Sequence, residues 1–134
     1  MTSAAATSDL LADEDLLHLK EKAYQFEAVQ DNGFVCVVIR NFPLPPAYTP
    51  GTTDLLLRLP PNFPMARPDM FWMYPHVRLS GGAYPQTADQ FDVQFQGRQW
   101  QRWSRHFGVS QWRPGTDNLK TFLGTIRSEL MKGI

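Results

Sequence analysis

The chain has 134 residues, and its 13 lysines and arginines are balanced by 13 aspartates and glutamates. This length predicts one domain with a core of its own, and the zero net charge excludes the excess of cations that nucleic-acid binding requires. The single cysteine excludes an internal disulfide, the three histidines show no zinc spacing, and no apolar run approaches the length of a membrane span. The sequence therefore predicts a cytoplasmic protein that needs no cofactor and binds neither nucleic acid nor membrane.

The chain begins with a short segment that differs from the rest. Residues 1–8 are small and mostly polar, which predicts a flexible tail ahead of a single domain over residues 9–134. The pattern over residues 9–24 is helical, because acidic side chains from Asp13 onward favour a helix start and Lys22 lies near its end. We expect one amino-terminal helix here.

Four extended runs follow the predicted helix. Residues 25–30 and 34–42 are separated by a turn at Asn32-Gly33, the strongest short-range signal for a hairpin. The second run is rich in β-branched residues, so we expect burial on both faces of that strand. Residues 52–59 and 70–73 predict a third and a fourth strand, and proline-rich connections separate the later strands.

The second half of the chain contains one ambiguous region and one clear helix. Residues 80–99 alternate only weakly, which predicts either an inserted loop or an extra hairpin. Residues 115–117 predict a capping region and Gly133 a helix end. Between them apolar side chains recur at helical spacing: Leu119, Phe122, Leu123, Ile126 and Leu130. The chain is thus predicted to be an α+β domain with a helix, a four-stranded antiparallel meander, an irregular segment and a carboxy-terminal helix.

Three proline motifs occur in a definite order, at residues 63–68, 74–76 and 112–114. With the order of elements, they resemble the divergent bacterial branch of the ubiquitin-conjugating enzyme family over most of residues 10–133. In that family a catalytic cysteine precedes a Trp-any-Pro motif by seven intervening residues, and the corresponding position here is Ser104. The motif at 74–76 falls where the family has His-Pro-Asn, and it ends in a histidine.

The resemblance implies a transferase that accepts a ubiquitin-like protein from an activating enzyme and passes it to an acceptor amine. Ser104 would be the nucleophile, and His106 a general base, since residues two apart in an extended segment point to one face. His76 would replace the asparagine thought to stabilise the oxyanion. A surface role for His106 and a structural role for His76 stay open.

Three interpretations stay open for Ser104 itself. It is a natural nucleophile, a relic in an inactive relative, or a designed replacement for a cysteine. The second interpretation predicts a catalytically inactive variant that acts as a binding scaffold for the ubiquitin-like protein or its activating enzyme.

Two further groups of residues bear on function. Cys36 lies among valines, where burial would raise the pKa of its thiol and make it a small apolar residue rather than a nucleophile. Trp100, Trp103, Arg105 and Trp112 lie in an aromatic and locally basic stretch. We predict that they form a partner-binding surface, with packing of Trp112 beneath the active-site segment as the alternative.

Overall fold

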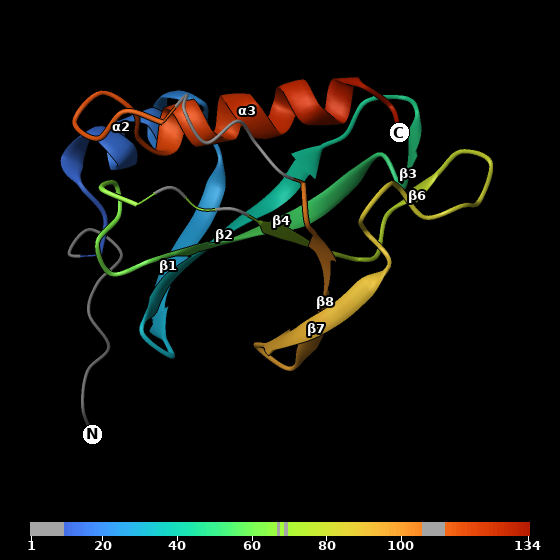
Figure 1. Ribbon diagram of the computed structural model, residues 1–134, viewed down its shortest axis with the longest axis horizontal. Coiled ribbons are helices and arrows are strands. Elements are labelled where there is room, and N and C mark those ends of the chain that lie inside the picture. Colours follow the sequence, from blue (N-terminus) through green and yellow to red (C-terminus); the bar gives the residue numbers. More distant parts are fainter. Residues whose placement is uncertain (1–9, 67, 69, 106–111) are drawn as a thin grey trace.

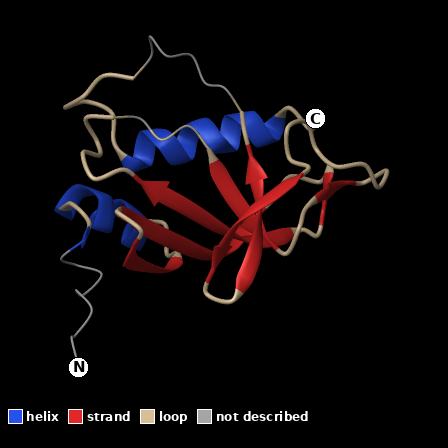
Figure 2. Cartoon of the chain, turned by 60° about the horizontal axis from the view of Figure 1, so that its bottom comes forward, coloured by secondary structure: helices blue, strands red, loops and turns tan. Residues whose placement is uncertain are grey.

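The computed structural model describes residues 10–66, 68, 70–105 and 112–134. It shows a twisted sheet with helices α2 (Asp13–Glu21) and α3 (Leu119–Met131) on one face (Figures 1 and 2). The opposite face, which we call the outer face, carries no helix in the described part of the chain. The α+β class is therefore confirmed.

The main sheet has six antiparallel strands in the order β1-β2-β4-β5-β8-β7. Its strands are β1 (Gln25–Asp31), β2 (Phe34–Pro43), β4 (Thr52–Leu59), β5 (Phe71–Tyr74), β8 (Arg98–Trp103) and β7 (Gln90–Phe95). A second sheet pairs β3 (Tyr48–Thr49) with β6 (Arg78–Leu79). The four strands predicted from the sequence are consecutive in the main sheet, and β8 and β7 extend it.

The added pair settles the ambiguity over residues 80–99. Strands β7 and β8 form a hairpin around Gln96 and Gly97, whose φ angles of 54° and 74° match the left-handed turn that joins twisted strands. The hairpin alternative is therefore confirmed. The first helix is shorter than its predicted range of 9–24 at both ends. It starts only after Ala12, whose backbone is extended, and Ala23 adopts a φ of 57° that turns the chain out of the helix.

Hydrophobic side chains pack on both faces of the sheet. The larger cluster lies between the sheet and the helices, and a smaller one lies on the outer face. On β2, Val37 and Ile39 belong to the first cluster while Cys36 and Val38 belong to the second, and each is at most 1% exposed. Burial of this strand on both faces was predicted and is confirmed.

Helix α3 presents the predicted apolar face to the sheet, since all five of its regularly spaced apolar residues are buried. Its N-cap is Asn118, one residue later than predicted, and Asn118 forms a capping box with Thr121. The Leu119 backbone N–H donates to Asp15 Oδ1 at 3.2 Å, which joins the start of α3 to α2. None of the described helices has the length and apolar character needed to cross a membrane.

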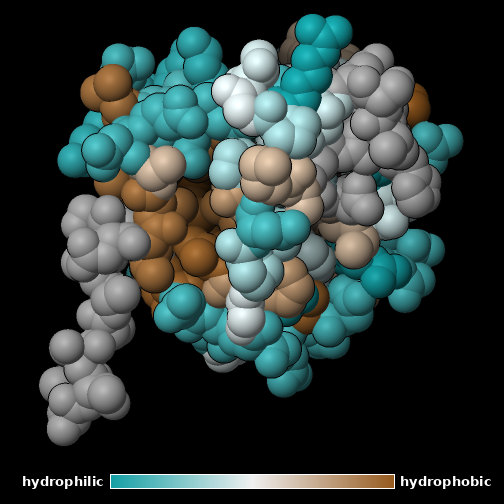
Figure 3. Space-filling model, turned by 60° about the vertical axis from the view of Figure 1, so that its left-hand side comes forward, coloured by the Kyte–Doolittle hydropathy of each residue, from teal (hydrophilic) through white to brown (hydrophobic). Residues whose placement is uncertain are grey.

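Apolar side chains also reach the surface. Figure 3 shows a hydrophobic hollow bordered by hydrophilic side chains on the left-hand side of the molecule as drawn in Figure 1. Partly buried apolar residues such as Val35 and Phe63 continue the larger cluster outward. The core is thus not fully closed by the described residues.

Candidate functional site

Ser104 directly follows β8 and is half-buried. Its backbone N–H donates to the Thr87 carbonyl at 3.1 Å. Along β8, Trp100 packs in the outer cluster and Trp103 in the helix-side cluster, as expected when successive side chains alternate between the faces. Continued for one residue, the alternation places Ser104 on the outer face together with Trp100.

Arg105, the residue after Ser104, is fixed on the opposite, helix-covered side of the sheet. Its side chain is 4% exposed, and Nη1 donates to Glu129 Oε1 of α3 at 3.1 Å. Nε donates to the Gln86 carbonyl at 2.9 Å, and Nη2 donates to the Ile134 carbonyl. Burial acts to raise the pKa of Glu129, but hydrogen bonds from Lys132 and Arg105 outweigh it and lower that pKa.

Gln101 fixes the insertion that connects β5 with β8. Its side chain is fully buried, Oε1 accepts from the Val77 N–H at 2.8 Å, and Nε2 donates to the Ala88 carbonyl at 2.8 Å. The amide therefore ties both ends of residues 77–88 to the strand that precedes Ser104. A glutamine among tryptophans gave no sequence signal for this role, because its partners are distant in the chain.

Trp112 marks the far end of the segment that begins at Ser104. Its Nε1 donates to the Pro64 carbonyl at 2.9 Å, and its ring centroid lies 6.1 Å from that of Phe63. The structure thus brings together two of the proline motifs that carry the family resemblance. His106, the predicted general base, lies outside the described residues.

His76 is placed away from Ser104. Its Nε2 donates to the Gln99 carbonyl at 3.0 Å, and its ring stacks on Phe91 with the centroids 4.4 Å apart. Gln99 precedes Ser104 by five residues of extended chain, a span of about 17 Å at roughly 3.3 Å per residue. An oxyanion donor must lie about 3 Å from the developing charge. The predicted oxyanion role of His76 at Ser104 therefore needs correction, because the insertion carries His76 to the opposite end of β8.

The predicted partner-binding surface also needs correction. Trp100 and Trp103 are fully buried, and the Trp103 ring stacks on Phe71 at a centroid distance of 5.4 Å. Arg105 is buried as well, through the contacts described above. Only Trp112 is half-buried, and it packs against the helix-side cluster, as its alternative interpretation predicted. Three of the four residues thus belong to the interior.

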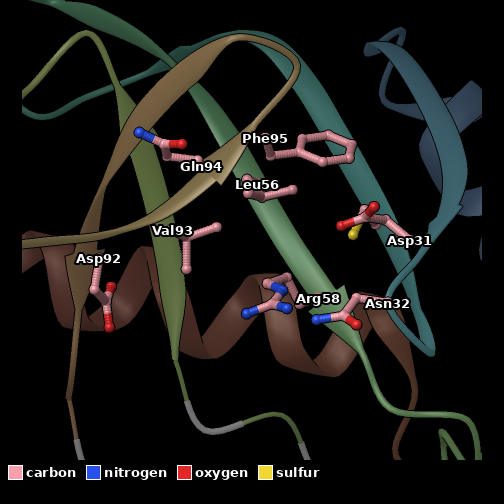
Figure 4. Close-up of a pocket in the computed structure, with 9 residues that line it drawn as sticks. Asp31, Asn32, Leu56, Arg58, Asp92, Val93, Gln94 and Phe95 are labelled. Carbon is pink, nitrogen blue, oxygen red and sulfur yellow. The ribbon is translucent and has the colours of Figure 1, made fainter.

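The outer face holds a feature that the sequence did not reveal. A cavity of about 280 Å³ lies between β7 and the β1–β2 turn. In Figure 4, Leu56 and Arg58 project from β4 between Asp31 and Asn32 on one side and Val93 on the other. Figure 1 shows the β1–β2 and β7–β8 hairpins extending away from the helices, and the cavity is lined by residues from both of them.

A second cavity of about 260 Å³ adjoins the first and shares Arg58, Asp92 and Val93 with it. It extends to Met70 and Trp72 on β5 and the segment before it. We call the two cavities together the outer trough. The available signal was the alternation within β4, where Leu56 and Arg58 share one face.

The Cys36 thiol is not placed for nucleophilic chemistry. The residue is 1% exposed beneath the outer trough, and burial raises the pKa of its thiol despite a hydrogen bond with Arg58. Both the burial and the direction of the pKa shift agree with the prediction.

Comparison with known protein families identifies the family of the chain. A family model described as prokaryotic E2 family E matches residues 11–133. E2 denotes the ubiquitin-conjugating class, so the predicted resemblance is confirmed at the level of the family. No curated protein and no solved structure matched the chain.

Proposed function

The chain belongs to the prokaryotic E2 family E, and from this premise we propose that Ser104 carries a ubiquitin-like protein between an activating enzyme and an acceptor amine. The observation that carries the proposal is the position of Ser104 in the structure. Its backbone is bonded to Thr87 and its neighbour Arg105 is fixed in the interior, while the strand alternation directs the serine to the outer face. Because activation consumes ATP, we place the reaction in the cytoplasm.

The proposed step exchanges one acyl bond for another. Ser104 Oγ attacks the carbonyl carbon of the thioester that joins the ubiquitin-like protein to the activating enzyme. A C–O bond forms, the C–S bond breaks, the hydroxyl proton passes to a base and the thiolate leaves. The acceptor amine then attacks the carbonyl carbon of the oxyester. A C–N bond forms, the C–O bond to Ser104 breaks, and a proton from the amine passes through the base to Ser104 Oγ, which restores the hydroxyl.

With serine as the nucleophile, acylation and transfer to the amine differ in how readily they proceed. A thiol is a better leaving group than an alcohol, so acylation of Ser104 is favourable while transfer from the oxyester is slower. The hydroxyl also needs a base, because it ionises far less readily than a thiol. No described side chain forms a hydrogen bond with Ser104 Oγ, and we assign the base role to His106.

The test uses the purified chain with ATP, a prokaryotic activating enzyme and the ubiquitin-like protein that this enzyme activates. We expect an adduct on Ser104 by mass spectrometry that is cleaved by hydroxide and is lost in Ser104→Ala. The matched variant Ser104→Cys should give a thiol-sensitive adduct instead. Binding without an adduct in either protein would refute the transferase and leave the scaffold function.

The role of His106 has its own test. His106→Ala should slow ester formation by about 10²–10⁴-fold, the usual contribution of a positioned base, without changing the affinity for the ubiquitin-like protein. His76→Ala is the control, because its ring contacts Gln99 and Phe91 rather than Ser104. Equal rates for His106→Ala and the unmodified chain would remove His106 from the mechanism.

A further inference from the structure

Strand β7 ends the main sheet, and among the described strands it pairs only with β8. The two-residue turn at Gln96 and Gly97 is closed by a hydrogen-bonded pair, so the next pair, Gln94 and Gln99, directs its backbone groups outward. The Gln99 carbonyl indeed bonds His76 on the side away from β7. By the same alternation, the Gln94 N–H and C=O point away from β8 and present a free edge.

The outer trough lies beside this edge and leads towards Ser104. Its first cavity is lined by β7, and its second shares Arg58 with the first and reaches Met70. The register pairs Phe71 with Trp103, and these two residues are the sequence neighbours of Met70 and Ser104. The trough therefore forms a path from the middle of β7 to the neighbour of the proposed nucleophile.

The direction of β7 determines how a strand would add to it. Gln90, the first residue of β7, pairs with Arg102, two residues before Ser104, and Phe95 lies at the far end. A segment that ends at Ser104 must run from the Phe95 end to the Gln90 end, which is antiparallel to β7. The six residues of β7 span about 20 Å at roughly 3.4 Å per residue, which matches an extended tail of about six residues.

Among the described residues that line the trough, Arg58 is the only basic one. Its guanidinium lies 4.4 Å from the Phe34 ring centroid and 5.5 Å from that of Trp72. No described carboxylate pairs with it, whereas Asp92 in the same lining is paired with Arg102 at 2.6 Å. Besides its hydrogen bond with the Cys36 thiol, Arg58 has further N–H groups that can donate to carbonyl or carboxylate oxygens of an entering chain.

We propose that the outer trough binds the extended carboxy-terminal tail of the ubiquitin-like protein, paired antiparallel with the free edge of β7. This inference rests on the proposed function, because that function requires the end of the tail to reach Ser104. The backbone of the tail pairs with the backbone of Gln94. The Arg58 guanidinium donates hydrogen bonds to carbonyl or carboxylate oxygens of the tail. Strand addition of this kind takes affinity from main-chain hydrogen bonds and tolerates varied side chains.

The experiment measures binding alone, without activating enzyme or ATP. The full chain, labelled with ¹⁵N, is titrated with the ubiquitin-like protein used in the adduct assay and with the same protein lacking its last six residues. We expect the intact protein to shift the Gln94 amide and Arg58 Nε resonances and to slow exchange of the Gln94 amide. The truncated protein should bind at least about ten-fold more weakly, a loss of about 1.4 kcal/mol.

Two variants at one position isolate the edge. Gln94→Pro removes the outward N–H without removing a hydrogen bond to β8, a substitution that edge strands tolerate. Gln94→Ala keeps the N–H and serves as the matched control. We expect at least about ten-fold weaker binding for the proline variant and less than about two-fold change for alanine. Arg58→Gln, with an expected loss of about five-fold or more, provides a second test should Gln94→Pro fail to fold.

The outcomes separate this inference from the proposed function. Equal binding by the truncated protein, shifts confined to α2 and α3, or unchanged binding by both Gln94→Pro and Arg58→Gln would overturn the trough proposal even if Ser104 forms an adduct. Tail-dependent binding at Gln94 with no adduct on Ser104 would instead refute the transferase and leave the trough as a binding site.

Discussion

The contact between Arg105 and Glu129 gives the sharpest test of how Ser104 is positioned. We choose Arg105→Met, because methionine keeps an apolar stem beside the Trp103 ring, whose centroid lies 5.2 Å from the guanidinium carbon. The substitution removes the charge and leaves the Glu129 carboxylate in place. It therefore measures the ion pair and its hydrogen bonds more than the loss of packing.

The size of the effect follows from the burial of both partners. Breaking a buried ion pair by removing one partner costs about 3–5 kcal/mol. Here the Glu129 side chain is 16% exposed and keeps a contact with Lys132 at 2.9 Å, which moves the expectation to the lower end of that range. The Gln86 and Ile134 carbonyls also lose a donor. We expect Arg105→Met to reduce the free energy of unfolding by about 3 kcal/mol.

Equilibrium urea unfolding, followed by tryptophan fluorescence, measures this loss. Glu129→Gln and the double variant complete a cycle in which the coupling energy should reach about 1 kcal/mol or more. Because the folded pKa of Glu129 is lowered, its stabilisation is present above its ordinary pKa of 4.5 and is lost as the pH falls through the folded value. A single-variant loss under about 1 kcal/mol, or a coupling energy near zero, would refute the reasoning.

Three further outcomes follow from buried groups. Burial raises the pKa of Asp15, so this group favours folding at low pH and its contribution is lost as the pH rises above 3.8. Asp15→Asn keeps an acceptor for the Leu119 N–H and should flatten this part of the dependence of stability on pH, measured by urea unfolding. Burial, aided by Arg127, lowers the pKa of His18, so stability should fall as the pH drops below 6.5, and His18→Leu should remove that slope. Leu123→Ala, at a fully buried position, should cost about 2–5 kcal/mol in the same assay.

The elements that the sequence predicted well are those whose burial follows a local period. The spacing of apolar residues in α3 and the β-branched run of β2 each identify the element and its buried faces. The turn at Asn32 and Gly33 was equally clear, since both residues adopt positive φ. These signals lie within a few residues of one another, so no knowledge of distant contacts is needed.

The site was harder to predict because its contacts are distant in the sequence. Trp100 and Trp103 lie between arginines in the sequence, which favoured a surface position. Both are instead buried, because apolar clusters cover both faces of this sheet. Arg105 resembles a surface charge until Glu129, 24 residues later, is placed beside it. The position of His76 depends on the path of the insertion, which Gln101 fixes through contacts that no short motif encodes.

Strand β8 divides structural and chemical roles between its two faces. Gln101, Trp103 and Arg105 bind the insertion, the core and α3, so the residue after the strand is held from the inner side. The insertion that moves His76 away from Ser104 is the same segment that supplies β7 and its free edge. On the proposed function, His76 thus does not supply the transition-state hydrogen bond expected of it, worth about 10²–10³-fold in rate, whereas the insertion provides a strand edge that aligns the incoming carbonyl. Alignment of reacting groups can contribute more than a single hydrogen bond, so we expect catalysis here to depend more on tail docking than on an oxyanion donor.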